Sequence, residues 1–198
     1  PENSPETGIL RVMEQEVERM ASLVANLLQF SRPGQRQISS LDLREEIEKT
    51  LELINNQLVH RQIILQRVFA PDLPLVQADR QQVRQLLLNL VSNASDAMPS
   101  GGVLTITAQP ESGGKKVRIE IQDTGIGIPA RELEKILEPF YTTKPEGKGT
   151  GLGLAICRRI VEEHHGTLTV TSPGLGKGAT VRIILPAANG SPSSILPD

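Results

Sequence analysis

The sequence predicts an α+β fold: a two-layer α/β sandwich in which helices cover one face of a mixed, mainly antiparallel sheet, preceded by a long heptad-patterned helix. Two observations carry this prediction. Most strand-like segments come in pairs joined by short turns, which is typical of antiparallel hairpins. Amphipathic helical segments lie between those pairs, and a chain of 198 residues can hold one such domain with an appendage.

The first predicted element is a helix over residues 8–32, which the sequence Arg32-Pro33-Gly34 ends. The strict 3.5-residue period of its apolar residues and the Pro-Gly break favour packing in a helical bundle or coiled coil over a helix that lies on its own domain. The a/d positions of this pattern are Leu10, Met13, Val17, Met20, Val24 and Leu27.

The elements that follow combine helical and period-2 patterns. Loop sequence rich in Gly and Pro occupies most of residues 124–149, where only a short helix at 131–137 is expected, and the tail at 188–198 is rich enough in Pro and Ser to predict disorder. The main elements are expected as a helix at 42–61, a strand at 63–68, a helix at 79–98, strands at 103–109 and 115–123, a helix at 152–165, and strands at 167–172 and 179–186.

Composition excludes several classes of function. A net charge of −2 gives no general reason to expect nucleic acid or an anionic membrane as partner, and the absence of Trp argues against base-stacking platforms. The single Cys157 excludes an internal disulfide and fits a reducing compartment. No apolar run reaches membrane-spanning length, and Pro1 in place of Met suggests a fragment or a processed chain.

The stretch QLLLNLVSNASDAM places two asparagines four residues apart in an apolar helix. Asn89, Asn93 and Asp96 share one face of that helix. From this helix alone, a solvated polar stripe is the favoured interpretation. The alternative is a row of oxygen acceptors and amide donors that face a ligand, and such oxygens suit Mg²⁺.

A second candidate is the stretch IQDTGIGIP, in which a strand ends at Asp123 and is followed by Gly125 and Gly127. A carboxylate at a strand end can accept a hydrogen bond from an exocyclic amine, and the glycines would let a flat ring approach the backbone. A simple turn with a capping Asp is the alternative.

The third candidate is the stretch GKGTGLGLAICRRIVEEHHG, in which four alternate glycines precede a helix. Glycine-rich backbone that leads into a helix N-terminus can bind an anion, whereas a flexible loop with Thr150 as N-cap is the alternative. The pattern is neither a Walker A loop nor a G-x-G-x-x-G fingerprint. The preceding segment LEPFYTTKPEGKG can act as a lid, with Lys144 and Lys148 available for phosphate charge.

In this order, the Asn helix, the D-x-G-x-G sequence, the Phe-containing lid and the G-T-G-L-G-L sequence resemble the N, G1, F and G2 boxes of sensor histidine kinases. These kinases belong to the superfamily that includes gyrase, Hsp90 and the mismatch-repair ATPases, and the resemblance covers residues 41–186. It implies the second helix of a dimerisation domain at 1–34, an ATP-binding catalytic domain at 35–187 and a disordered tail at 188–198.

The resemblance implies ATP and Mg²⁺ as cofactors. Asn93 would coordinate Mg²⁺ with Asn89 hydrogen-bonded nearby, Asp123 would accept from the adenine amino group, and Lys144 would contact the γ-phosphate. Thr180 would lie beneath the adenine. Asn89 and Lys144 are the catalytic candidates, and the implied nucleotide-binding set is Asn89, Asn93, Asp96, Asp123, Gly125, Gly127, Ile128, Lys144, Gly149, Thr150, Gly151, Leu152, Gly153 and Thr180.

One substitution favours a kinase over a hydrolase. ATPases of the superfamily place a Glu four residues before the metal-binding Asn, and Asn89 stands at that position here. An amide cannot act as a general base at neutral pH, so phosphoryl transfer to a protein histidine, and onward to an aspartate of a response regulator, fits better than hydrolysis. A serine kinase of the anti-sigma-factor type is the alternative. A degenerate module that has lost nucleotide is disfavoured because every box is intact.

The family's acceptor histidine lies in an H-[ED]-x-x-x-P box, which this chain lacks. His60, His164 and His165 are better explained as surface or helix-end residues. We therefore expect that this chain binds nucleotide without autophosphorylation and is a monomer or weak dimer. In the intact protein the resemblance implies a homodimer, a response-regulator receiver domain as partner, and a cytoplasmic location, compatible with the cytoplasmic part of a membrane-anchored sensor.

Overall fold

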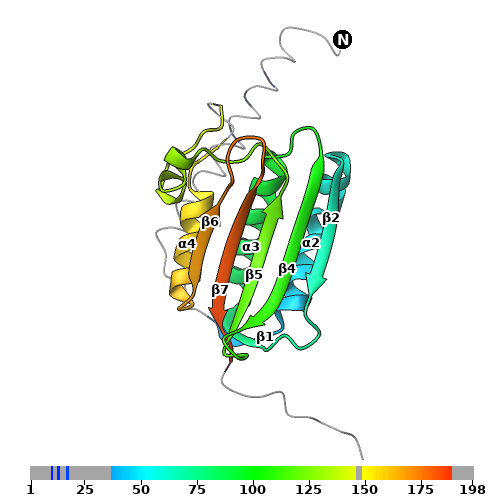
Figure 1. The fold of residues 1–198 in the computed structure, drawn as a ribbon, viewed down its shortest axis with the longest axis vertical. Coiled ribbons are helices and arrows are strands. Elements are labelled where there is room, and N and C mark those ends of the chain that lie inside the picture. Colours follow the sequence, from blue (N-terminus) through cyan, green and yellow to red (C-terminus); the bar gives the residue numbers. More distant parts are fainter. Residues whose placement is uncertain (1–9, 11–12, 14–16, 18–36, 146–148, 189–198) are drawn as a thin grey trace, which may run out of the picture.

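The computed structural model describes residues 10, 13, 17, 37–145 and 149–188. Its main body is a five-stranded sheet with three helices packed on one face (Figure 1). The elements are β1 (Ile38–Leu41), α2 (Leu43–His60), β2 (Ile63–Phe69), β3 (Val76–Asp79), α3 (Arg80–Asp96), β4 (Gly102–Glu111), β5 (Lys116–Asp123), α4 (Gly153–Glu163), β6 (Thr167–Thr171) and β7 (Ala179–Pro186).

The sheet has the strand order β2-β4-β5-β7-β6. Strands β2 and β4 are parallel, and the other three pairs are antiparallel. The mixed, mainly antiparallel sheet with helices on one face confirms the predicted α+β class. The register of β5 with β7 places Asp123 opposite Ala179 and Gln122 opposite Thr180.

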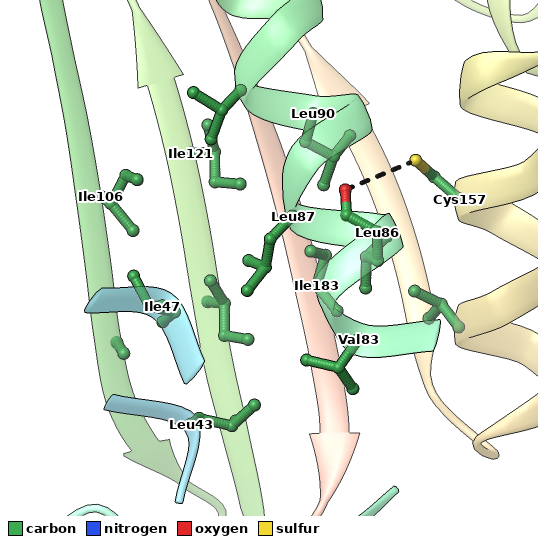
Figure 2. Packing of buried hydrophobic residues seen from close by; sticks show 14 of the residues in the cluster. Leu43, Ile47, Val83, Leu86, Leu87, Leu90, Ile106, Ile121, Cys157 and Ile183 are labelled. Atoms are coloured by element: carbon green, nitrogen blue, oxygen red, sulfur yellow. Dashed lines mark hydrogen bonds between the residues drawn. The ribbon is translucent and has the colours of Figure 1, made fainter. Parts of the chain in front are cut away.

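The core lies between the helices and the sheet (Figure 2). Alternate residues of β5, such as Ile119 and Ile121, are buried against α3, as the period of 2 in that strand requires. Fully burying an apolar side chain of this size contributes about 1.5–3 kcal/mol. Cys157 of α4 points toward α3 and donates to the Leu86 carbonyl oxygen at 3.8 Å, and burial raises the pKa of its thiol to about 12.

Aspartates cap two of the three helices that lie over the sheet. Asp42 caps α2, and Asp79 caps α3 by accepting from the backbone N–H groups of Gln81 and Gln82 at 2.9 and 3.1 Å. Burial acts to raise the pKa of Asp79, but these bonds and one from Gln37 outweigh it, so that the pKa is lowered overall.

His164 connects the end of α4 to the start of α3. Its Nε2 accepts from the Asp79 backbone N–H at 2.9 Å, and its Nδ1 lies 2.7 Å from the Ile160 carbonyl oxygen, to which it donates in this tautomer. His164 is 4% exposed. It stands at the C-cap of α4, as expected for a helix-end residue, and its burial and hydrogen bonds make it a structural residue.

Several predicted elements differ from those observed. Strands β1 and β3 are absent from the predicted elements; they form a separate two-stranded antiparallel sheet, and each is only four residues long, which is too short for a clear apolar period. The helix expected at 131–137 is two short 3-10 turns, Ala130–Glu132 and Lys135–Leu137. The predicted heptad helix lies outside the described residues except for Leu10, Met13 and Val17, which are helical and exposed, and most of the predicted tail also lies outside them.

Among the residues that the structure describes, none of the helices combines the length and the apolar character needed to cross a membrane.

Candidate functional site

Three elements that are far apart in the sequence bring their ends together at one end of the sandwich (Figure 1). Helix α3 ends there after Asn93 and Asp96, β5 ends there at Asp123, and α4 begins there at Gly153. The backbone of Gly153 is close enough to α3 that a Cβ built on it would lie 3.7 Å from Asn93 Nδ2. The three motifs found in the sequence thus lie at the same end of the sandwich.

Asp123 is a buried carboxylate at the end of β5, with 8% of its surface exposed. Its Oδ1 accepts from the Gly125 N–H at 2.8 Å, and the Ala179 N–H also donates to its side chain. Burial raises the pKa of Asp123, and these backbone donors offset only part of the effect. The carboxyl group is therefore held by backbone donors without any cationic partner among them.

The loop that follows Asp123 is joined to the loop between β6 and β7. The N–H groups of Gly176 and Gly178 donate to the carbonyl oxygens of Ile126 and Gly125 at 2.7 and 3.0 Å. Ser172 Oγ accepts from the Ile128 N–H at 3.0 Å and donates to the Gly178 carbonyl oxygen at 2.7 Å. Sequence analysis missed Ser172 and Gly178, for which the glycine-rich stretch SPGLGKG was the available signal.

The glycines of these loops make room for protein backbone. A Cβ on Gly125 would lie 2.3 Å from the Ala97 carbonyl oxygen, and one on Gly127 would lie 2.1 Å from that of Gly174. Gly127 also has a φ of +69°, which L side chains rarely adopt. The expectation that these two glycines admit a flat ring remains a prediction, whereas their role in loop packing is visible in the structure.

Gly178 and Gly176 offer a matched test of this packing. Both have φ near +70° (+69° and +72°), but a Cβ on Gly178 would lie 1.9 Å from the Asp123 carbonyl oxygen, whereas a Cβ on Gly176 would meet nothing within 4 Å. Gly176→Ala should cost about 1–2 kcal/mol of unfolding free energy from φ alone. Gly178→Ala should cost at least about 2 kcal/mol more and displace Asp123. Urea unfolding of both variants measures the difference, and equal losses would contradict the close-packing argument.

Lys144, in the segment before α4, contacts the polar face of α3. Its Nζ is 2.6 Å from Asp96 Oδ2 and 3.4 Å from Asn93 Oδ1, and the guanidinium of Arg61 donates to Asp96 Oδ1 at 2.7 Å. Burial acts to raise the pKa of Asp96, but the hydrogen bonds and charges of Lys144 and Arg61 lower it overall. The structure therefore brings together Asn93, Asp96 and Lys144, and adds Arg61, which sequence analysis missed; the contact of Lys144 with the γ-phosphate remains a prediction.

Asn89 lies one turn before Asn93 on α3. Its Oδ1 accepts from Gln85 Nε2 at 2.9 Å, and its buried Nδ2 forms no hydrogen bond of ordinary geometry with the described residues. The side-chain amide lies near the Cys157 thiol, where the larger effect of burial raises the pKa and the amide acts to lower it. Among the described residues, no group of three or more His, Cys, Asp or Glu side chains could hold a metal ion. A metal at this site would therefore depend on amide oxygens, on the Asp96 carboxylate and on oxygens of a ligand.

The segment before α4 packs on the segment around Phe140. The Phe140 N–H donates to the Gly151 carbonyl oxygen at 3.0 Å, and a Cβ on Gly151 would lie 2.3 Å from the Phe140 carbonyl carbon. Thr150 Oγ1 accepts from the Leu152 N–H at 3.3 Å, but the N-cap position is Leu152, and no side chain caps the helix. Capping by Thr150, the alternative to an anion site, is therefore not observed, and no side chain of the described residues accepts from the first N–H groups of α4, as an anion site requires.

Ile128 and Thr180 complete the predicted nucleotide-binding set. Ile128 is partly buried, with its N–H bound to Ser172. Thr180 pairs with Gln122, so its side chain lies on the opposite face of the sheet from that of Asp123. The strand register thus places Ala179, one residue earlier, beside Asp123 and leaves Thr180 outside the cluster.

The sequence of the chain is similar to those of known histidine kinases and ATPases. Residues 78–189 match the family of histidine kinase-, DNA gyrase B- and HSP90-like ATPases. The chain is 39% identical over 178 residues to sensor histidine kinase ZraS of Escherichia coli K12, covering 90% of this chain and 37% of that protein. It is 40% identical over 187 residues to sensor kinase CckA of Brucella abortus, covering 88% of this chain and 20% of that protein. It thus spans well under half of these relatives.

Solved structures show the same likeness. The catalytic domain of histidine kinase ThkA has a TM-score of 0.69 and 32% identity, covering 76% of this chain and 96% of that one. Full-length ShkA in complex with AMPPNP has a TM-score of 0.81 and 26% identity, covering 96% of this chain and 40% of that one. The resemblance drawn from the four boxes is confirmed: the chain belongs to the family of histidine kinase-, DNA gyrase B- and HSP90-like ATPases.

Proposed function

We propose that this chain is the catalytic, ATP-binding part of a two-component sensor histidine kinase. The observation that carries the proposal is the convergence of Asn93, Asp123 and the start of α4 at one end of the sandwich. The ShkA neighbour was solved with the ATP analogue AMPPNP, and the relatives that match about nine-tenths of this chain are sensor kinases. These findings support ATP as the nucleotide.

Each end of the nucleotide would meet a different part of the site. The buried Asp123 carboxylate would accept from the adenine amino group, with the joined loops around Gly125, Gly127 and Ile128 beside the base. The uncapped start of α4 and the backbone from Gly149 to Gly153 would hold the phosphates through N–H groups. Lys144 would supply a positive charge to the γ-phosphate.

The polar end of α3 fits Mg²⁺. Asn93 Oδ1 and the Asp96 carboxylate are oxygen donors of the kind that Mg²⁺ binds, and the Lys144 ammonium already lies between them as a cation of the chain itself. Asn93 would hold the ion. Bound there together with the nucleotide, Mg²⁺ would neutralise charge on the triphosphate.

The site favours phosphoryl transfer to a protein over hydrolysis. Asn89 has no basic atom, and its side-chain oxygen is engaged by Gln85, so it cannot take a proton from water. In the transfer, a histidine nitrogen bonds to the γ-phosphorus while the bond from that phosphorus to the β–γ bridging oxygen breaks, and ADP leaves. The names of the relatives favour histidine over the serine acceptor of an anti-sigma-factor-type kinase.

The remaining parts of the proposal concern the whole protein. Residues 1–34 would be the second helix of a dimerisation domain, 35–187 the catalytic domain and 188–198 a tail. The intact protein would be a homodimer, and this part of it would lie in the cytoplasm. A receiver domain of a response regulator would be the partner. The structure of histidine kinase ThkA in complex with response regulator TrrA, with a TM-score of 0.77 and 29% identity, supports that partner.

Two measurements test the proposal. Titration calorimetry should show binding of an ATP analogue that Mg²⁺ strengthens, and Asn93→Ala should remove most of the Mg²⁺ effect. With labelled ATP, this chain alone should stay unlabelled, whereas an added dimerisation domain from the full-length protein should gain acid-labile phosphate. Acid-stable phosphate on a serine would favour the alternative kinase class, and a folded sample that binds no nucleotide would contradict the proposal.

A further inference from the structure

The Lys144 ammonium lies where a cation would be held. It is bound to Asp96 Oδ2 at 2.6 Å and lies 3.4 Å from Asn93 Oδ1, the oxygen to which the proposed function assigns the metal. The ion pair is partly buried, because the side chains of Lys144 and Asp96 are 33% and 29% exposed. Partial burial reduces screening by solvent, so the pair is stronger than one at the open surface.

Asp96 has a position that helix stability alone does not favour. It is the last residue of α3, where the negative end of the helix dipole disfavours a carboxylate. Two cations from elsewhere in the chain compensate: Arg61, which follows α2, binds Oδ1 at 2.7 Å, and Lys144 binds Oδ2. Arg61 thus fixes one carboxylate oxygen and leaves the other directed at Lys144.

We propose that Lys144 is the resident cation of the metal site, held by Asp96 beside Asn93 until a metal ion displaces it. This inference rests on the proposed function, because it assigns the same site to Mg²⁺. The ammonium and Mg²⁺ compete for the same two side chains, since the ion binds oxygen at about 2.1 Å and would repel a cation in contact with those oxygens. Before the metal binds, Asp96 is the positioning residue of Lys144. Once displaced, Lys144 is free to turn toward the phosphates.

The first test compares the affinity for AMPPNP in excess EDTA with that in Mg²⁺. If Lys144 replaces the metal, Lys144→Met should raise the ratio of the dissociation constant in EDTA to that in Mg²⁺ about tenfold. A factor of this size is a typical coupling between two bound groups. Lys144→Arg should retain the wild-type ratio. The control is Lys135→Met, which removes the same charge from an exposed site in the same region. If Lys144 only contacts phosphate, its replacement by Met would weaken both affinities equally and leave the ratio unchanged. An unchanged ratio would overturn the proposal.

Asp96 is tested through its coupling to Lys144. In an Asp96→Asn background, Lys144→Met should change the ratio less than about twofold, because the ammonium is no longer held in the site. A purely structural role of Asp96 would lower both affinities without removing this coupling. A full tenfold effect of Lys144→Met in that background would show that Asp96 does not position the lysine.

A second test needs no nucleotide. Water-proton relaxation with Mn²⁺ alone should show about tenfold tighter binding to Lys144→Met than to the wild type, and Asn93→Ala should cancel the gain. Absence of the gain in a protein that binds AMPPNP would overturn the resident-cation proposal and leave the proposed function intact. The gain in a protein that binds no AMPPNP would support the cation site and contradict the proposed function.

Discussion

Asp123→Ala should lower the affinity for ATP at least about 100-fold while the chain stays folded, because it removes a charged acceptor from a buried site. The adenine amino group would then lose its only expected carboxylate partner, and the Gly125 and Ala179 N–H groups would lose theirs. Titration calorimetry measures the loss. Asp72→Ala, which removes an exposed carboxylate, is the control, and wild-type affinity in Asp123→Ala would rule out this adenine site.

Asp123→Asn separates the charge of this residue from its shape. Because burial raises the folded-state pKa of Asp123, its ionised form costs stability, and the favourable contribution is present at low pH and lost as pH rises through that pKa. At neutral pH, Asp123→Asn should therefore bind ATP weakly without a lower melting temperature. A large drop in melting temperature would indicate that the carboxylate is needed for folding rather than for binding.

The same raised pKa predicts a pH dependence of binding. Adenine recognition needs the ionised carboxylate, so affinity should fall as pH is lowered through the pKa of Asp123, starting at a higher pH than an ordinary carboxyl would give. Adenosine as ligand removes the titration of the phosphates from the profile. The profile of Asp123→Asn should lack this step.

The parts of the site that the sequence predicts are those whose signals are local. Asn93 and Asp96 share a helix face at fixed spacing, and Asp123 is read from a strand followed directly by two glycines. The helices and the five strands of the main sheet follow from apolar periods, with boundaries shifted by a few residues. These features need no knowledge of distant contacts.

The features that sequence analysis missed depend on contacts between distant residues. Ser172 meets Ile128 only because β7 lies between β5 and β6 in the sheet, and Arg61 meets Asp96 across 35 positions of sequence. The register of β7 against β5 decides on which face of the sheet the Thr180 side chain lies, and a shift of one residue would reverse that face. Strands β1 and β3 are four residues each and form because tertiary packing brings them together.

Two ion pairs of the buried Glu46 carboxylate join α2 to α3. Removing the charge of Glu46 should cost less unfolding free energy than removing its arginine partners. Glu46 is 0% exposed, and its two oxygens bind Arg80 at 2.7 Å and Arg84 at 3.2 Å. The arginine side chains are 47% and 38% exposed, so they can return to water when the carboxylate is removed. Glu46→Gln should therefore cost about 1–2 kcal/mol, mainly through weakened hydrogen bonds.

Replacing both arginines by methionine should cost more, about 3 kcal/mol, because it leaves a buried carboxylate without partners; partial solvent access keeps the loss at the low end of the range for buried pairs. Urea unfolding of each variant gives the two free energies. Arg158→Met, which breaks an exposed pair with Glu162 at 54% and 57% exposure, should cost no more than about 0.5 kcal/mol. If the double arginine variant were no less stable than Glu46→Gln, the isolated charge would not be the dominant cost of breaking these ion pairs.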